Sequence, residues 1–210
     1  YRQLAGEMHS QDLAILRLLL AILTTVYTRF DANGALYPWL EMGTKTPTVD
    51  QGMYDDSGQH DLLATWKNLH QAGRFSEGGW EYFEKYQARF DFFGKQPFYQ
   101  VTTEEYDALV PENKRVAAGK GQVSVKQLNR RVSESAHSPA IFAPKSGEAK
   151  NEIPLDELVR WIITYQNFTG VTDKTKVVTV EKFSNPAGWL YRINPVFVKG
   201  ESLFETLMLN

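Results

Sequence analysis

The sequence predicts a mainly α-helical protein with a small β component, an α+β fold class. Four stretches carry apolar residues at helical spacing, whereas only two short stretches combine β-branched and aromatic residues as strands do. The chain of 210 residues is 42% hydrophobic and 13% aromatic, which is the composition of an ordinary globular protein. That length suits a substantial core, so we expect residues 1–210 to form a single domain.

The N-terminal half is expected to consist of three helices joined by polar connections. Residues 12–30 repeat leucines at helical spacing on nearly every side, which indicates a helix buried in the core. An Asn-Gly pair then signals a turn, and residues 43–60 are predicted to be a polar loop. Amphipathic patterns predict the next helices over 62–70 and 80–93, the second with an aromatic stripe along one side.

The C-terminal half alternates predicted helices with extended or irregular segments. A helix over 155–168 has the clearest signals, because Pro154 opens it beside two acids and Gly170 offers a stop. Shorter helices are expected over 103–109 and from residue 203 onward. The segments that look extended or β-like are 94–101, 176–180 and 189–198, and a loop rich in Ser, Ala and Pro covers 133–151. Both ends of the chain look cut, so we interpret the sequence as a fragment of a longer protein.

Charge is distributed very unevenly along the chain. Residues 114–131, "KRVAAGKGQVSVKQLNRR", hold six cations and no anion, and the wider stretch 113–150 carries a formal charge of +6. The rest of the chain carries −8, which gives the total of −2. Like charges repel, so this run needs a solvated surface, acidic neighbours or an anionic partner. We expect residues 113–152 to form a flexible basic loop region that can approach a phosphate backbone closely.

The residue patterns of common catalytic and metal sites are missing from the sequence. The four histidines include no pair at the i,i+4 spacing of a helical zinc site. His60 beside Asp55, Asp56 and Asp61 is best explained by an acidic surface loop. The stretch "GKGQVS" lacks the third glycine of a nucleotide-binding loop, and no P-loop or nucleophile elbow occurs. We therefore predict no catalytic residue, no metal, no cofactor and no enzyme activity.

The sequence contains no cysteine and shows no obvious targeting segment. The absence of cysteine excludes disulfides, a cysteine nucleophile and thiolate metal sites, and it suits the cytoplasm. The longest apolar run, residues 13–26, is interrupted by Arg17 and is interpreted as too short to span a bilayer. No signal peptide is visible at the start. We expect a cytoplasmic protein with no membrane partner.

Five segments in a fixed order resemble a known family. They are "DLAILRLLLAIL" (12–23), "RFDFFGKQPFYQV" (89–101), "SPAIFAPKSG" (138–147), "ELVRWIITYQNFTG" (157–170) and "GESLFETLMLN" (200–210). Together they resemble the N-terminal domain of CasA, the large-subunit family of the type I-E CRISPR surveillance complex, Cascade. No single segment is as specific as a zinc signature, but the resemblance covers almost the whole chain.

The resemblance implies a non-catalytic subunit of an RNA-guided antiviral complex. Members of this family contact the 5′ end of the guide RNA, inspect the short motif that flanks a target, and help open the DNA duplex. They also help recruit the helicase-nuclease that degrades the target. The implied partners are other Cascade subunits, guide RNA, double-stranded target DNA and the helicase-nuclease. In such systems base pairing reads most of the target sequence, while protein reads the flanking motif and the backbone.

Two functional elements of the family match positions in this sequence. The family's anchor loop bears a Phe that matches Phe142, with Ile141, Ala143 and Lys145 beside it. Some members have Asn where this chain has Pro144, so a side-chain hydrogen bond at that position is not expected. The second element, a glycine-rich loop that reaches the minor groove, corresponds to the stretch from Gly170. That stretch has one glycine, so we expect Lys174 or Lys176 to contact phosphate instead.

The basic segment completes the predicted nucleic-acid interface. Its residues are Lys114, Arg115, Lys120, Lys126, Arg130 and Arg131. We interpret them as lining a surface that faces guide RNA or target DNA. One alternative is a protein–protein scaffold whose basic segment docks on an acidic partner. Another is an enzyme whose catalytic residues lie outside this fragment.

Overall fold

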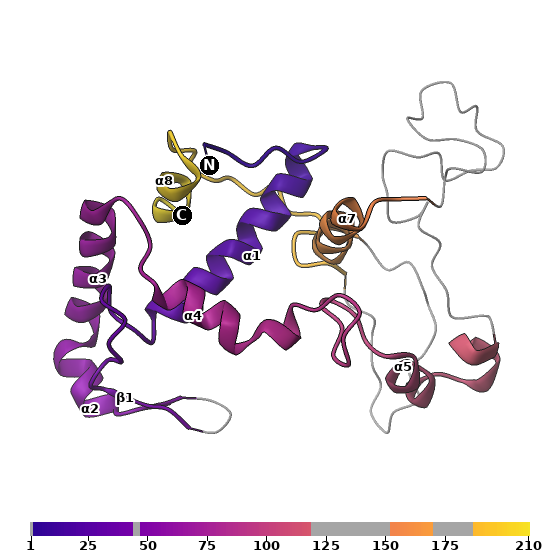
Figure 1. Ribbon diagram of the computed structural model, residues 1–210, viewed down its shortest axis with the longest axis horizontal. Coiled ribbons are helices and arrows are strands. Elements are labelled where there is room, and N and C mark those ends of the chain that lie inside the picture. Colours follow the sequence, from indigo (N-terminus) through magenta and orange to yellow (C-terminus); the bar gives the residue numbers. More distant parts are fainter. Residues whose placement is uncertain (1, 44–46, 119–151, 170–186) are drawn as a thin grey trace. The chain divides into compact units, whose positions relative to one another are not determined.

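The computed structural model describes residues 2–43, 47–118, 152–169 and 187–210, and helices dominate them (Figure 1). In chain order the elements are α1 (His9–Tyr27), β1 (Leu40–Glu41), β2 (Thr48–Val49), α2 (Gln51–Met53), the π-helix η1 (Tyr54–Gly58), α3 (Gln59–Ala72), α4 (Gly78–Lys85), the 3₁₀ turn η2 (Gln87–Arg89), α5 (Thr103–Leu109), the 3₁₀ turns η3 (Glu112–Lys114) and η4 (Val116–Ala118), α7 (Leu155–Phe168) and α8 (Leu203–Met208). The predicted fold class, mainly α with a small β component, is confirmed.

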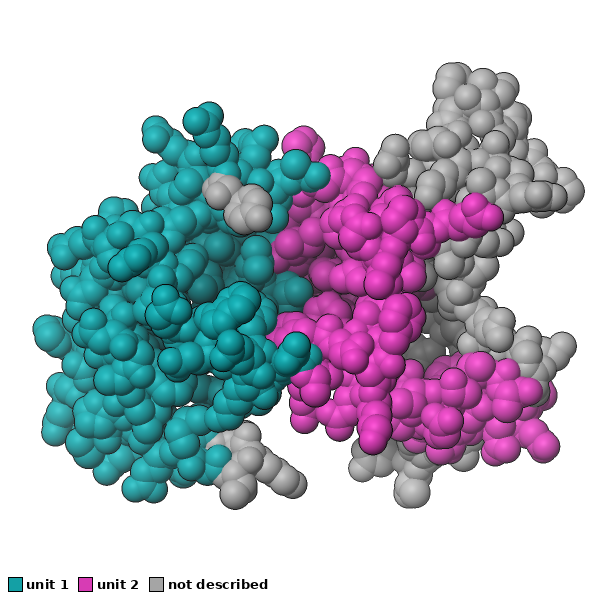
Figure 2. Space-filling model, in the orientation of Figure 1, with its two compact units in different colours: residues 1–5, 16–87, 196–210 teal, residues 6–15, 88–195 magenta. Residues whose placement is uncertain are grey.

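The chain forms two compact units, which Figure 2 shows in different colours. Unit 1 comprises residues 1–5, 16–87 and 196–210, and unit 2 comprises residues 6–15 and 88–195. Helix α1 contributes its first residues to unit 2 and the remainder to unit 1. The expectation that residues 1–210 make a single domain stays a prediction.

The core of unit 1 is built from aromatic rings around the end of α1. Tyr27 is almost fully buried and packs against Trp66 of α3 and against Phe75, with ring centroids 6.1 and 6.0 Å apart. Phe75 in turn packs on Phe204 of α8 at 4.8 Å. The Tyr27 hydroxyl accepts a hydrogen bond from the backbone N–H of Ser76 at 2.9 Å, which satisfies the polar tip of a buried ring. Segments distant in sequence are thereby joined in one apolar cluster.

A second aromatic cluster in unit 1 holds the short sheet. The rings of Tyr37 and Trp39 stack with centroids 4.7 Å apart, and Tyr54 meets Trp39 edge-on at 5.1 Å. Burial raises the pKa of Tyr37, and its hydroxyl donates a hydrogen bond to Oγ1 of Thr65 at 2.6 Å. Next to this cluster, β1 and β2 pair antiparallel with Leu40 opposite Val49.

The prediction of a polar loop over 43–60 is wrong for the described part of that range. It contains β2, α2 and η1, and α3 begins at Gln59. The Asp50 carboxylate starts α2 by accepting a hydrogen bond from the backbone N–H of Met53 at 3.1 Å. The polar residues of this range therefore belong to helical structure. Tyr54 of η1 packs against the cluster of Tyr37, Trp39 and Leu40, a contact that a surface loop would lack.

Two further predictions about local structure need correction. The helix expected over 80–93 ends at Lys85, and α4 is followed by the 3₁₀ turn η2. Beyond it, the Asp91 carboxylate accepts a hydrogen bond from the N–H of Phe93, which competes with helix continuation. The segment 94–101, expected to be extended, instead contains turns, with Tyr99 at a φ of 58°.

The β-like segment 189–198 forms no strand, and this prediction is also wrong. Trp189 to Arg192 make turns, and the residues that follow lie without regular structure. A strand needs a neighbour for its ladder of hydrogen bonds, and no described strand lies beside this segment. The other predicted strand, 176–180, and the loop 133–151 lie outside the described residues. The predicted helix from residue 203 is confirmed as α8.

The predicted helix over 12–30 is confirmed as α1, which begins and ends three residues earlier than predicted and is only partly buried. Its 19 residues are long and apolar enough to cross a bilayer by length and composition alone, which corrects the expectation that the run is too short. Core helices of soluble proteins and signal sequences meet the same criterion. In the part of α1 that belongs to unit 1, the side chains of Leu16, Leu23 and Val26 are buried.

Candidate nucleic-acid interface

Helix α5 precedes the basic segment and begins where predicted, at Thr103. A reciprocal capping box starts it: the hydroxyl of Thr102 accepts from the N–H of Glu105, and the Glu105 carboxylate accepts from the N–H of Thr102 at 3.0 Å. This signal lies entirely in the local sequence and sets the beginning of α5, and both predicted ends, Thr103 and Leu109, are confirmed.

Asp107 of α5 fixes the beginning of the basic segment. Its two carboxylate oxygens accept hydrogen bonds from the backbone N–H groups of Val116 and Ala117, at 2.6 and 3.1 Å. Immediately before these positions, Lys114 and Arg115 are exposed, and neither forms an ion pair within the described part of the chain. The backbone at the beginning of the basic segment is therefore held in place, and the first two cations of the segment are exposed to solvent. This role of Asp107 is not visible in the sequence, because a carboxylate nine residues away carries no local motif.

The other predicted site residues lie outside the described residues. These are Lys120, Lys126, Arg130, Arg131, Ile141, Phe142, Ala143, Lys145, Gly170, Lys174 and Lys176. The structure therefore brings together only Lys114 and Arg115 of the predicted set, on neighbouring positions. Gly170, expected to end the 155–168 helix, is among the residues not described, and the residue that caps α7 is Thr169.

Helix α7 has the predicted ends, and a charged cluster in unit 2 joins it to Glu7, two residues before α1. The Arg160 guanidinium donates to Glu7 at 2.7 Å and to Asp156, one helical turn earlier, at 2.9 Å. Burial acts to raise the pKa of Glu7, but hydrogen bonds from Arg160, its own backbone and Gln11, together with the charge of Arg160, bring the pKa below its ordinary value. Hydrogen bonding to Arg160 likewise lowers the pKa of Asp156. Both carboxylates are therefore ionised at neutral pH and anchor Arg160.

Backbone hydrogen bonds join the end of α7 to the residues that follow the segment 170–186, and we call this pairing the neck. The N–H of Gly188 donates to the carbonyl of Thr169 at 2.8 Å, and the N–H of Leu190 donates to the carbonyl of Asn167 at 2.7 Å. The buried Asn167 side chain is itself fixed, since its Nδ2 donates to the carbonyl of Ile163. A Cβ at Gly188 would lie 2.5 Å from the Asn167 carbonyl oxygen, so the close approach requires glycine.

A pocket of about 240 Å³ lies in unit 2 between the first turn of α1 and α7. It is lined by Met8, Ser10, Trp161, Thr164, Tyr165, Phe168 and Thr169. Trp161 is completely buried, and its indole N–H donates to Glu157 at 3.4 Å. The Oγ1 atom of Thr169 is buried and finds no hydrogen-bond partner among the described residues. The lining is uncharged and holds no nucleophile–base pair, so the pocket supplies no catalytic constellation of its own.

The described residues contain no group of three or more histidine, aspartate or glutamate side chains that could hold a metal ion. His60 lies 3.8 Å from the carboxylate of Asp61, its immediate neighbour, and the histidine side chain is almost fully exposed. Asp55 accepts a hydrogen bond from Gln51 one turn earlier. These residues belong to the exposed side of the η1–α3 helical stretch, where they contact their own neighbours.

Comparisons with known proteins identify the family. The profile of the family described as CRISPR-associated protein Cse1 matches residues 1–210. Cse1 from Thermobifida fusca has a similar fold, with a TM-score of 0.58 at 20% identity over 100% of this chain and 32% of that one. Cse1 from Acidimicrobium ferrooxidans gives a TM-score of 0.52 at 26% identity over 99% of this chain and 31% of that one. No curated protein matches the chain.

The fold and the family profile together place the chain in a class of CRISPR-associated proteins. The chain belongs to the Cse1 family. This is the Cascade large-subunit family that the five ordered segments resemble. The chain spans about a third of the length of the two solved Cse1 structures.

Proposed function

We propose that the chain is the N-terminal part of a non-catalytic large subunit of Cascade. In this role it contacts the 5′ end of guide RNA and the target DNA beside the flanking motif, and it helps to recruit the helicase-nuclease in the cytoplasm. The observation that carries the proposal is membership of the Cse1 family over residues 1–210. The uneven charge of the chain supplies the physical mechanism, because +6 is confined to residues 113–150 in an otherwise acidic protein.

The basic segment is proposed to contact phosphates without reading bases. Phosphate contacts position a protein on a nucleic acid, while base edges carry the sequence information. Lys114 and Arg115 support the proposal, because both are exposed beside the anchor that Asp107 provides. A cationic segment held at one end suits a complex in which the guide RNA supplies sequence specificity.

Phe142 is proposed to anchor the subunit on the guide-loaded complex, together with Ile141, Ala143 and Lys145. The proposal comes from the match between "SPAIFAPKSG" and the anchor loop of the family. An aromatic side chain beside small residues can be buried in a partner's pocket at low conformational cost.

The segment from Gly170, with Lys174 and Lys176, is proposed to reach the minor groove of the target. The described neck supports this proposal, since the Thr169–Gly188 hydrogen bond fixes the place from which the segment departs. Minor-groove patterns are degenerate, so contacts there would tolerate more than one flanking sequence.

A salt titration tests the phosphate contacts. Lys126, Arg130 and Arg131 are replaced by Ala in the natural full-length subunit, and DNA binding is measured across salt concentrations. We expect weaker binding and a log–log slope that falls by about 0.9 for each phosphate that the variant no longer neutralises. The matched control replaces Lys67, Arg74 and Lys85, three exposed cations of unit 1, and should leave the slope unchanged. An unaltered slope in the first variant rejects the phosphate role, and binding to an acidic protein instead favours the scaffold alternative.

A pull-down tests the anchor. Replacing Phe142 with Ala in the full-length subunit should reduce its capture by a guide-loaded complex that lacks the large subunit. Phe142→Leu retains apolar volume and should retain part of the capture. Full capture of the Ala variant would show that Phe142 does not anchor the subunit.

A further inference from the structure

A loop in unit 2 presents an exposed aromatic ring between η2 and α5. We call residues 90–100 the Phe93 loop. The side chain of Phe93 is 76% exposed, whereas that of its neighbour Phe92 is buried at 9%. Burying an aromatic ring is strongly favourable, so a loop that buries one phenylalanine and exposes the next leaves a large contact surface available to a partner.

Hydrogen bonds within the Phe93 loop hold its backbone in place. The N–H of Phe98 donates to the carbonyl of Asp91 at 3.0 Å, and the N–H of Phe93 donates to the Asp91 carboxylate at 2.9 Å. The side-chain amide of Gln100 donates to the carbonyl of Phe92 at 3.0 Å. Gly94 allows the tight turn, because a Cβ there would lie only 3.0 Å from the Asp91 side chain. The loop is therefore organised before any partner binds, which lowers the entropic cost of binding.

The orientation of the Phe93 ring is set by Phe92. The two rings meet at 90° with centroids 5.1 Å apart, an edge-to-face geometry that aromatic pairs favour. Because most of the Phe93 side chain stays exposed, this contact orients the ring without covering it. An oriented, open aromatic ring is suited to stacking against another planar group.

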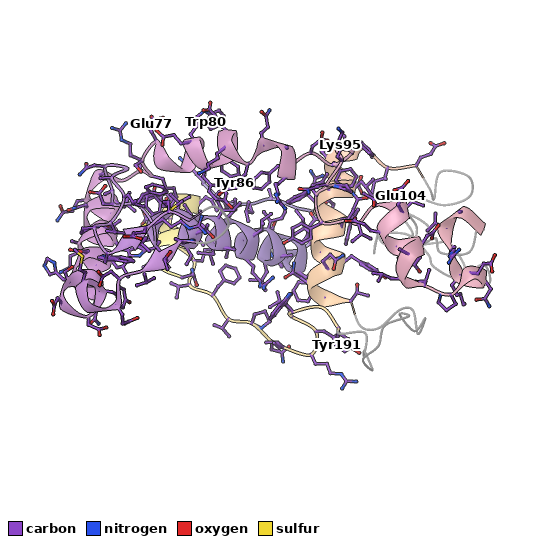
Figure 3. All side chains as sticks on the ribbon, turned by 90° about the horizontal axis from the view of Figure 1, so that it is seen from below. Glu77, Trp80, Tyr86, Lys95, Glu104 and Tyr191 are labelled. Carbon is purple, nitrogen blue, oxygen red and sulfur yellow. The ribbon has the colours of Figure 1, made fainter. Side chains whose placement is uncertain are left out.

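Two exposed cations lie close to Phe93 in the sequence and could meet the phosphates of an anionic partner. They are Arg89 and Lys95, and neither forms an ion pair within the described part of the chain (Lys95 is labelled in Figure 3). The loop also contains one acid, Asp91, whose carboxylate accepts the N–H of Phe93, and α5 begins with two exposed acids, Glu104 and Glu105. Helix α5 also connects this loop to the basic segment in the chain.

We infer that Phe93 is a stacking platform for an unpaired nucleotide, with Lys95 and Arg89 contacting the neighbouring phosphates. Every base has a π face, so stacking accepts any sequence, and cations that follow the backbone add affinity. The inference rests on the proposed function and deepens it, because it names single-stranded nucleic acid as the ligand class. The competing possibility is that the Phe93 ring inserts into an apolar pocket of a protein partner. The experiment below distinguishes these two possibilities.

The test uses the full-length subunit and short oligonucleotides that contain 2-aminopurine, a base whose fluorescence falls on stacking. Single-stranded DNA and single-stranded RNA form separate arms, which distinguish the target from the guide, and duplex DNA is the reference. We expect quenching with a single strand, and Phe93→Ala should abolish it and weaken binding by about 5- to 150-fold. Phe93→Trp should retain both properties, whereas Phe93→Leu should behave like the Ala variant because it lacks a π face.

The controls decide between stacking, simple apolar contact and packing within the longer chain. Val101→Ala removes another exposed apolar side chain of unit 2 and should change neither quenching nor affinity. Wild-type quenching and affinity in Phe93→Ala would overturn the inference, as would a Phe93→Leu variant that matches the wild type. A Tm lowered by several degrees in Phe93→Ala would also overturn it, because the ring would then be buried in the full-length protein.

Failure of this inference and failure of the proposed phosphate contacts are distinguishable. If Phe93→Ala loses quenching while the Lys126, Arg130 and Arg131 variant keeps its salt slope, stacking stands and the phosphate role of the basic segment falls. If the salt slope drops while Phe93→Ala still quenches like the wild type, the phosphate role stands and the stacking platform is rejected.

Discussion

The two units bury very different kinds of side chain. Among the described residues, the buried set of unit 1 is almost entirely apolar, whereas polar groups make up much of the buried set of unit 2. The buried polar side chains of unit 1 are Thr65 and Thr206, and those of unit 2 are Gln11, Glu157, Thr164, Asn167 and Thr169. Unit 2 also carries the beginning of the basic segment and the Phe93 loop.

This difference indicates how each unit is stabilised. Aromatic packing of the kind around Tyr27 depends on burial alone and responds little to pH or salt. Buried polar groups contribute only while their partners are present and correctly charged, and an unpaired one is costly. We therefore expect unit 2 to depend more on charge and on exact partners, and the following substitutions test that comparison.

The largest effect is expected at the centre of unit 2. Trp161 is fully buried and forms a wall of the 240 Å³ pocket, so Trp161→Ala enlarges an existing cavity and removes a hydrogen-bond donor to Glu157. We expect a loss of about 3–5 kcal/mol in the free energy of unfolding, measured by urea denaturation of the full-length protein. A loss below about 1 kcal/mol would show that this pocket region contributes little to the unit.

A smaller effect is expected from removing one polar atom in the aromatic core of unit 1. Tyr27→Phe keeps the ring but leaves the N–H of Ser76 without its acceptor at 2.9 Å. The expected cost is about 1–3 kcal/mol by the same denaturation measurement, and it should not vary between pH 5 and 8. A strong pH dependence would contradict the view that unit 1 is insensitive to charge.

A pH-dependent effect is expected from Glu7→Gln in unit 2. The folded-state pKa of Glu7 lies below its ordinary value of 4.5, so its ion pair with Arg160 stabilises the protein above that pH. This contribution disappears as the pH falls through the lowered pKa, and the variant should then approach the wild type. At pH 7 we expect a loss of about 1 kcal/mol. Asp156→Asn, at the exposed partner of the same arginine, should cost less. If the wild type and Glu7→Gln differed by the same free energy of unfolding at pH 7 and at pH 3, the ion pair would not be the source of the stabilisation.

The smallest effect on stability is expected at the surface of unit 1. Trp80 is 65% exposed on the outer side of α4, where its indole N–H donates to Glu84 (Figure 3). Trp80→Ala should change the free energy of unfolding by no more than about 0.5 kcal/mol in thermal or urea denaturation. A larger loss in the full-length subunit would show that the longer chain buries this ring.

Sequence patterns predicted those elements whose signals lie within a few residues. The ends of α5 and α7 were correct, because Thr102 and Pro154 mark where each helix begins. The β1–β2 pair was missed, since the partners lie across a connection and depend on the Tyr37–Trp39 cluster. Segment 189–198 was wrongly predicted to be β-like, because its composition is typical of a strand but no described strand lies beside it to pair with.

The candidate site was predictable to a lesser degree. Clustered cations are visible in the sequence, and Lys114 and Arg115 are exposed as expected. Asp107 and Gly188 could not be identified in advance, because their roles arise from contacts with backbone groups distant in the sequence. Phe93 was predicted to be the last residue of a helix over 80–93, whereas it lies in a loop beyond α4 with its side chain 76% exposed.

The neck at Thr169 and Gly188 has a consequence for how this protein can change. Because a backbone hydrogen bond already joins the two sides of the segment between them, a longer insert would add little closure entropy, about 0.6 kcal/mol for each doubling of length. Related proteins could therefore exchange that insert for others of different length and composition while α7 stays intact. The neck would then be a fixed position at which segments of different length can be accommodated.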